Sequence, residues 1–223
     1  MMQIAPILKV GRGVSALIGG GGKTTLLCTL AEELRRHGSV VLCTSTHIRV
    51  PEGYPLVTGG AEELRAALAA HGAVCAGTPA ENGKLTAPPI SFEDLAALAD
   101  YVLVEADGAK GLPLKAHAAH EPAIPPNAQR VILVVGADGF GRPIAQVCHR
   151  PALYAERAGV SVDAEATPEL AARVIEAEGF GDRVFINKVE SAGAYAAAEE
   201  LANRLSCPVA AGSLRQGVYT GWR

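Results

Sequence analysis

Short apolar runs alternate with amphipathic stretches along most of this 223-residue chain. The runs at 101–104 and 131–135 are apolar throughout, which is typical of strands that are buried on both faces of a sheet. Further strands are expected at 14–18, 40–45, 183–186 and 207–212. Because helical periodicity separates most of these runs, the pattern predicts an α/β fold with a mostly parallel central sheet covered by helices.

The start and stop signals of the expected helices are local. Thr167 and Pro168 open a helix that runs to Glu178, and Ser91 is an N-cap candidate with Asp94 three residues later. Other helices are expected at 23–36 and 62–70, and an alanine-rich one ends near 205. Loop-rich insertions lie near 50–60 and 78–90, and "ENGK" in the second is able to turn a hairpin. The chain shows no linker or repeat, so we expect one domain over 1–223.

A glycine-rich segment follows the first strand and opens the first long helix. "GGGGKTT" spans Gly19, Gly20, Gly21, Gly22, Lys23, Thr24 and Thr25. Backbone N–H groups at a helix N-terminus bind anions, so this context predicts a phosphate-binding loop. Lys23 would reach the β- and γ-phosphates and Thr24 would ligate Mg²⁺. The usual loop has glycine at position 17, where this chain has leucine, and the shorter loop resembles that of the Mur ligases. Because this loop joins a strand to a helix in a chain that alternates the two, we expect a three-layer P-loop NTPase-like fold that binds a nucleoside triphosphate and Mg²⁺.

A metal-bound phosphate needs a second anchor, usually an acid at the end of a neighbouring strand. "YVLVEADGAK" offers two acids, Glu105 and Asp107, and Gly108 completes an acid-x-x-Gly spacing that resembles the switch motif of GTPases. Both acids are candidates for catalysis and for the metal, and the sequence leaves open which of them faces the ion.

The stretch "NKVE" lies at the end of the strand expected at 183–186 and resembles the guanine-recognition motif N-K-x-D. Asn187 would brace the loop, Lys188 would lie along the base and Glu190 would accept hydrogen bonds from it. Glutamate is one methylene longer than the usual aspartate, so adenine stays an alternative to guanine. Ser213, in "AAGS", is a candidate for the last base-contacting loop.

Two other segments carry candidates for a second substrate or a partner. Thr46 and His47 follow the second strand in "CTSTHIRV". The proline-flanked stretch "AKGLPLKAHAAHEPAIPP" contributes Lys110, Lys115, His120 and Glu121. Its H-x-x-H-E order is not the zinc-protease pattern, and its prolines leave little room for the helix that such a site needs.

Composition narrows the class of protein. The net charge is −3 and the pI is near 6.1, which gives no sign of a surface for nucleic acid or an acidic membrane. Five cysteines without a CxxC pair favour a reducing compartment, and no apolar run has the roughly 20 residues that a membrane span needs. We therefore expect a cytoplasmic protein.

Taken together, "GGGGKTTLL", "TSTHI", "EADGAKGLPLKAHAAHEPAIP", "VVGADGFGRPI" and "NKVE" resemble the YqeC-like accessory proteins of selenium-dependent molybdenum hydroxylases. The resemblance covers roughly 14–213. It implies a P-loop protein that serves the maturation of such a hydroxylase, and it makes Lys110, Lys115, His120 and Glu121 part of the family signature. His117 stands where we would expect proline in relatives, so the resemblance assigns it no role.

The sequence thus predicts a slow GTPase or ATPase that uses Mg²⁺ and assists maturation of a molybdenum hydroxylase. The expected partners are a nucleoside triphosphate and the hydroxylase or its maturation factors, with a homodimer left open. One alternative is an ATP-dependent ligase or kinase acting on a small anionic substrate. Another is a non-enzymatic scaffold gated by nucleotide.

Overall fold

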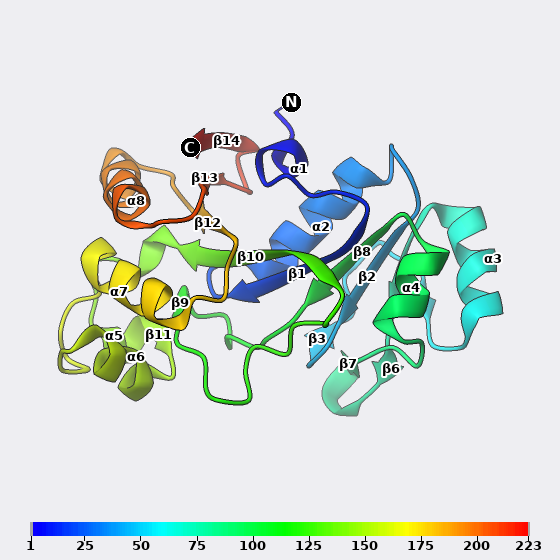
Figure 1. Cartoon of the computed structure of the whole chain (residues 1–223), viewed down its shortest axis with the longest axis horizontal. Coiled ribbons are helices and arrows are strands. Elements are labelled where there is room, and N and C mark those ends of the chain that lie inside the picture. The colour runs from blue at the N-terminus through cyan, green and yellow to red at the C-terminus, as the bar shows by residue number, and fades with distance from the viewer. Residues whose placement is uncertain (1, 223) are drawn as a thin grey trace.

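A nine-stranded sheet forms the middle layer of the computed structural model, which describes residues 2–222 (Figure 1). Its strand order is β14-β13-β12-β10-β1-β8-β2-β5-β4, and every neighbouring pair is parallel except β13 and β14. The strands are β1 (Gly13–Gly19), β2 (Val40–Thr44), β4 (Leu56–Val57), β5 (Ala73–Ala76), β8 (Tyr101–Glu105), β10 (Ala128–Gly136), β12 (Arg183–Asn187), β13 (Val209–Ser213) and β14 (Val218–Trp222).

Helices cover both faces of this sheet because the strands are apolar on both sides. Residues such as Leu17 and Phe185 pack against α1 (Ile4–Ile7) and α2 (Lys23–Leu34) on one face. The alternate residues, such as Ile18 and Ile186, face the other side. The helices on that side are α3 (Ala61–His71), α4 (Phe92–Leu98), α5 (Ile144–Val147), α6 (Pro151–Ala158), α7 (Pro168–Glu178) and α8 (Ala192–Arg204). The prediction of a three-layer α/β fold with a mostly parallel central sheet is confirmed.

The two loop-rich insertions contain short strands. β4 lies in the first and extends the main sheet beside β5. In the second, β6 (Thr78–Pro79) and β7 (Lys84–Thr86) form the antiparallel hairpin expected around "ENGK", and β3 (Ile48–Arg49) joins them. A further small pair joins β9 (Leu114–Lys115) to β11 (Cys148–His149).

Local capping explains where several helices begin. The hydroxyl of Ser91 accepts from the N–H of Asp94 (3.1 Å), and the hydroxyl of Thr167 accepts from the N–H of Leu170 (3.2 Å). α7 runs from Pro168 to Glu178, as its start and stop signals predict.

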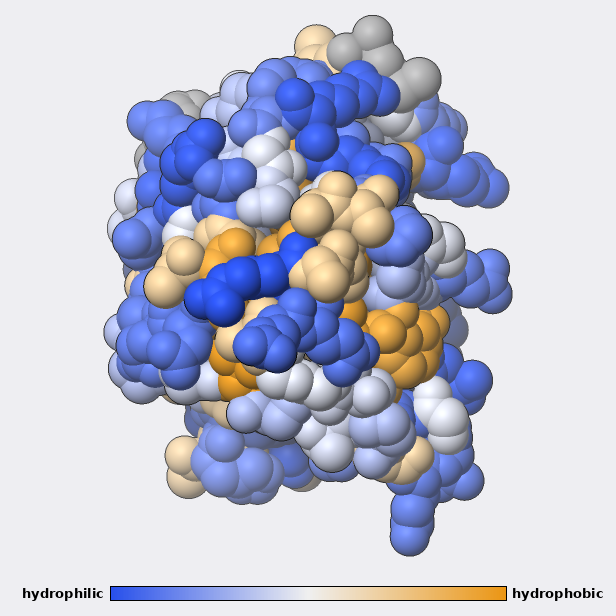
Figure 2. Space-filling view, turned by 90° about the vertical axis from the view of Figure 1, so that its right-hand side faces the viewer, coloured by the Kyte–Doolittle hydropathy of each residue, from blue (hydrophilic) through white to orange (hydrophobic). Residues whose placement is uncertain are grey.

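Several elements were not anticipated from the pattern, among them α1, α5, α6 and the antiparallel edge strand β14. Of these, α1 packs beside β14, so elements near the two ends of the chain lie side by side, at the top of the view in Figure 1. On the face that carries α3 and α4, hydrophilic side chains surround an area in the middle where hydrophobic side chains reach the surface (Figure 2). Between residues 2 and 222 we find no helix with the length and apolar character needed to cross a membrane.

Candidate functional site

The glycine loop joins β1 to α2 in the middle of the sheet, where only glycine fits. Gly21 has φ +73°, and a Cβ built there would lie 2.2 Å from the backbone nitrogen of Gly136 at the end of β10. A Cβ on Gly20 would lie 2.6 Å from the carbonyl oxygens of Leu112 and Pro113. The short loop is therefore clamped between β10 and the segment that contains Leu112.

The N–H groups of the first three glycines are already used inside the protein. Gly19 donates to Asp107 (2.8 Å), Gly20 to the Val134 carbonyl (2.9 Å) and Gly21 to the Leu112 carbonyl (3.0 Å). By contrast, no side chain caps the N-terminus of α2. The first N–H groups of a helix have no partner within it, so the first turn of α2, from Lys23, is the part of the loop whose backbone donors suit an anion. The glycines contribute its shape.

Thr24 and Glu105 meet behind this turn. The hydroxyl of Thr24, in the first turn of α2, donates to Oε2 of Glu105, at the end of β8, over 2.7 Å. The ammonium of Lys23 donates to the Gly19 carbonyl (2.6 Å) and lies 3.8 Å from Oε1 of Glu105. Burial raises the pKa of Glu105, against the opposing effects of Lys23 and Thr24. These residues come together as the sequence predicts.

Asp107 is fully buried, and its carboxylate contacts donors other than Thr24. Its Oδ2 accepts from His117 Nε2 (2.7 Å) and lies 3.1 Å from the Lys115 ammonium. Its Oδ1 lies 3.0 Å from the Lys23 ammonium, a charge contact whose angle does not make a hydrogen bond. The carboxylate of Asp107 therefore holds Lys23, whereas Glu105 is the acid beside Thr24.

These contacts shift the pKa of Asp107. Burial alone would raise it, but the hydrogen bond from His117 and the neighbouring lysine charges lower it to about 2. The pKa of His117 is raised. Burial alone would lower it, but the hydrogen bonds and negative charges of Asp107 and Glu178 outweigh burial. The site thus contains a buried, ionised cluster with both signs of charge.

The cluster extends outward through two acids. Nδ1 of His117 lies 2.5 Å from Glu178 at the end of α7, and Glu178 also pairs with Arg157. Lys115 lies 3.2 Å from Glu121, which accepts from Arg150 over 2.8 Å. Burial would raise the pKa of Glu121, but the hydrogen bond from Arg150 and the charge of Lys115 lower it to about 2.

The four residues predicted to meet a partner, Lys110, Lys115, His120 and Glu121, do not all lie at the surface. The side chain of Lys115 is 0% exposed, so it is not the surface contact for a partner that its sequence position suggests. Lys110 and His120 are exposed, and His120 lies 3.5 Å from the guanidinium of Arg150. The sequence pattern does not single out His117, Glu178 or Arg150 as site residues. The only signal for His117 is its position two residues after Lys115, and nothing marks Glu178.

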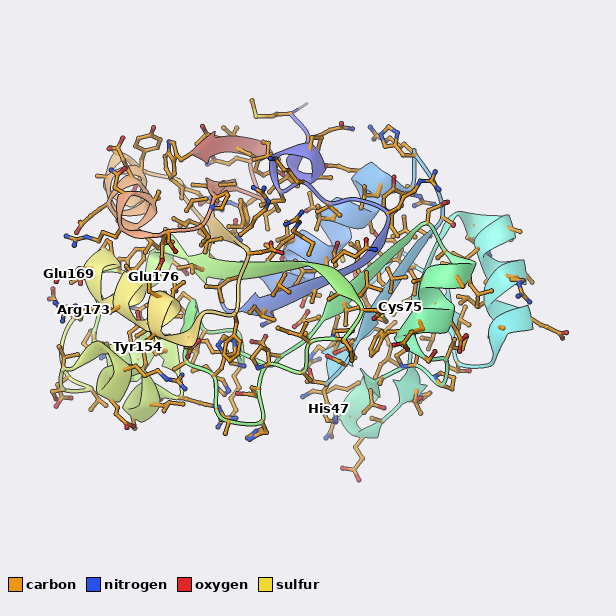
Figure 3. All side chains as sticks on the ribbon, viewed as in Figure 1. His47, Cys75, Tyr154, Glu169, Arg173 and Glu176 are labelled. Atoms are coloured by element: carbon orange, nitrogen blue, oxygen red, sulfur yellow. The ribbon has the colours of Figure 1, made fainter. Side chains whose placement is uncertain are left out.

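Thr46 and His47 follow β2 beside Glu105. The hydroxyl of Thr44 donates to the Glu105 carbonyl (2.7 Å) and accepts from the N–H of Thr46 (3.0 Å). His47 is exposed and lies next to β3, away from Tyr154 on α6 (Figure 3). The structure places Thr46 near the end of β8 and turns His47 toward solvent.

A second group surrounds an open pocket of about 390 Å³ beside Gly22 and Thr25. Asn187 donates to the Gly21 carbonyl (2.8 Å) and accepts from the N–H of Leu214 (3.1 Å), so it ties the loop to the end of β13. The pocket is lined by Gly22, Thr25, Asp138, Asn187, Lys188, Glu190, Leu214 and Arg215.

The charged residues of this pocket are paired. Lys188 contacts Asp138 over 2.7 Å. Glu190 accepts from the hydroxyl of Ser213 (2.7 Å) and from Arg215 (2.6 Å), and these contacts lower its pKa. All four residues of the predicted base-binding set lie together. Arg215 and Asp138 also line the pocket. Of these two, only Asp138 could have been suspected from the sequence, because it follows a predicted strand.

The donor set near the loop suits a hard cation. The oxygens of Thr24 and Glu105 are the kind of ligands that Mg²⁺ takes together with phosphate oxygens. Within the described residues, no group of three or more His, Cys, Asp and Glu side chains could hold a metal ion by itself. The pair would therefore bind the ion only in company with a nucleotide.

Comparison with known proteins identifies relatives. The profile of a family described as "YqeC protein" matches residues 15–152, more than half of the chain. A protein of Escherichia coli (strain K12), described as "Uncharacterized protein YqeC", is 35% identical over 160 residues. The match covers 68% of this chain and 62% of that relative, so it spans less than two thirds of the relative's length.

Among solved structures, the chain matches that of the signal recognition particle 54 kDa protein from Aeropyrum pernix K1 in complex with GDP. The TM-score is 0.43 with 18% sequence identity, and the match covers 95% of this chain and 44% of that one.

Proposed function

The chain belongs to the YqeC family, and from this premise we propose that it is a slow nucleoside triphosphatase that prefers GTP. The observation that carries the proposal is the 2.7 Å contact between Thr24 and Glu105 behind an uncapped helix N-terminus. It supports phosphate and metal binding at one place. Membership of the family and the P-loop type of fold support nucleotide binding in general.

Each residue has a defined part in this proposal. The N–H groups at the start of α2 bind phosphate oxygens, and the ammonium of Lys23 neutralises charge on the terminal phosphates. Asp107 and the Gly19 carbonyl hold that ammonium at the loop beforehand. Thr24 and Glu105 would hold Mg²⁺, which supplies charge neutralisation on the phosphates when bound.

The pocket beside the loop is the proposed base site. Glu190 lies at its wall with two donors already on its carboxylate, and a carboxylate has about four acceptor sites. The remaining sites suit the two adjacent donors of guanine, whereas adenine offers an amine beside an acceptor. This difference is why we expect a preference for GTP.

We propose that nucleotide hydrolysis serves the maturation of selenium-dependent molybdenum hydroxylases. The resemblance of residues 105–125 to accessory proteins of these enzymes supports this role. None of the five cysteines stands in a CxxC pair or another motif expected of a selenium carrier, so we propose that the protein acts through nucleotide-dependent contacts with a partner. Weak hydrolysis by the purified protein and stimulation by the hydroxylase or its maturation factors are expected.

The decisive test is a titration with fluorescent GTP and ATP analogues, with and without Mg²⁺, on the wild type, Lys23→Ala and Glu190→Ala. Lys84→Ala serves as the control because Lys84 is exposed on β7. We expect metal-dependent binding that Lys23→Ala abolishes and a guanine preference that Glu190→Ala removes. Absence of binding at tens of micromolar would refute the proposal. A preference for ATP with turnover that requires a small acid would favour a ligase or kinase instead.

A second experiment addresses the role in the cell. A strain that lacks the gene is complemented with the wild type or Lys23→Ala, and the activity of a selenium-dependent hydroxylase is measured. Restoration by the wild type alone is expected. Equal restoration by Lys23→Ala would contradict a role for nucleotide in maturation.

A further inference from the structure

The turn after β8 carries two backbone donors that the protein does not use. The N–H groups of Gly108 and Ala109 donate no hydrogen bond to any residue from 2 to 222. Successive free N–H groups in a turn form an anion-binding concavity. Asp107, directly before them, is immobilised by its buried contacts, so the start of this turn is rigid.

Lys115 holds the other side of the same turn. Its ammonium donates to the Gly108 carbonyl (2.6 Å) and lies 3.1 Å from Asp107 and 3.2 Å from Glu121. These three acceptors match the three donors of an ammonium group. Removing a charge from water costs several kcal/mol, and an apolar residue of similar size often serves stability equally well. A buried lysine at this place is therefore better explained by what it orients than by the stability it adds.

Peptide planarity links the two observations. A trans peptide points its C=O and its N–H in opposite directions. Because Lys115 draws the Gly108 carbonyl into the interior, the N–H of Ala109 must point away from Lys115. The lysine thus fixes the direction of the free donor.

The strand order indicates which part of a nucleotide would meet this turn. The base pocket is built by residues after β12, which lies two strands from β1 in the order β12-β10-β1-β8. Gly108 follows β8, on the opposite side of β1. A nucleotide with its base at β12 and its phosphates on α2 therefore directs its terminal phosphate toward β8.

We propose that Lys115 is a positioning residue for recognition of the terminal phosphate, because it holds the Gly108 carbonyl and thereby presents the N–H of Ala109, next to that of Gly108, to the γ-phosphate. The inference rests on the proposed nucleotide binding and adds to it a residue outside the loop that separates triphosphate from diphosphate. Removing Lys115 lowers the affinity for the triphosphate and spares that for the diphosphate.

The test compares Lys115→Met with the wild type by calorimetric titration with GppNHp and with GDP, both with Mg²⁺. If the base site prefers adenine, AppNHp and ADP replace them. Methionine keeps the length and buried volume of the side chain, and Lys84→Met controls for loss of a positive charge. We expect Lys115→Met to weaken GppNHp binding by about tenfold, the scale of hydrogen bonds to a charged group, and to leave GDP binding unchanged. Lys188→Met, on the base side, should weaken both nucleotides.

A measurement on the wild type covers the case in which Lys115→Met does not fold. Amide hydrogen exchange at Gly108 and Ala109 should slow with GppNHp and stay unchanged with GDP. Equal weakening of both nucleotides by Lys115→Met, or equal exchange with both in the wild type, would overturn the inference while nucleotide binding stands. A wild type that binds neither nucleotide would overturn the proposed function itself.

Discussion

Gly21 is a position at which one added carbon should be costly. It has φ +73°, and a Cβ there would meet three backbone atoms at the end of β10: Gly136 N at 2.2 Å, Gly136 Cα at 2.6 Å and Val135 C at 2.7 Å. Backbone atoms of a central strand cannot rotate aside as a side chain does. Gly21→Ala must therefore displace the loop or the end of β10.

The matched control is Gly53→Ala. Gly53 has a similar φ of +84°, but nothing lies within 4 Å of its would-be Cβ. The left-handed conformation costs an alanine about 1–2 kcal/mol at either position. Only Gly21→Ala adds the cost of overpacking, about 1–3 kcal/mol. We therefore expect Gly21→Ala to lower the free energy of unfolding by roughly 2–5 kcal/mol, and Gly53→Ala by the conformational part alone.

Urea unfolding of both variants measures this difference, and binding of a fluorescent GTP analogue measures its consequence. Gly21→Ala should lose most of its nucleotide affinity, because a displaced loop moves the first turn of α2. Gly53→Ala should bind as the wild type does. Equal stability of the two variants, together with unchanged binding by Gly21→Ala, would refute the close approach of loop and strand.

Three further predictions concern the contacts around the loop. Asn187→Ala leaves the Leu214 N–H without its acceptor and frees the Gly21 carbonyl, so urea unfolding should show a loss of about 1–3 kcal/mol; no loss would contradict the brace. Since the pKa of Glu121 is lowered to about 2, its stabilisation is present above its ordinary pKa near 4.5 and is lost as pH falls toward 2. Unfolding of Glu121→Gln should therefore depend less on pH in that window, and an unchanged acid profile would count against the ion pairs. The pKa of His117 is raised rather than lowered, so its pH dependence is reversed. Its contribution to the free energy of unfolding is complete below about pH 6.5 and declines as pH rises through the folded pKa. His117→Gln should flatten that alkaline decline in the same assay, and a decline that persists would place its origin elsewhere.

Local chemistry accounts for what the sequence predicted well. The caps at Ser91 and Thr167 act on N–H groups three residues away, so their signals are contained in a few neighbouring positions. The glycine loop follows the same logic, since strand, glycines and helix are consecutive. The fold class, the glycine loop and the grouping of the residues after β12 could therefore all be predicted from the sequence pattern.

The elements that the pattern missed depend on packing. Only Tyr219 is buried in β14, so the strand has almost no hydrophobic alternation and exists because it pairs with β13. α1 is four residues long and is secured by the carboxylate of Glu33, which accepts from the N–H groups of Ile4 and Ala5. Such a short helix has no periodicity to read.

The buried charge cluster was decided by tertiary structure alone. His117 and Glu178 are 61 positions apart in the sequence. The different contacts of Glu105 and Asp107 could be distinguished only in the structure, where β8 lies beside β1. A lysine in a proline-rich stretch reads as a solvated surface residue, and Lys115 is inside because three acceptors converge on it. The sequence by itself determined the features whose causes lie within a few residues, such as the helix caps and the glycine loop. The pairing of buried charges was left to the folded chain, because it depends on distances that only folding sets.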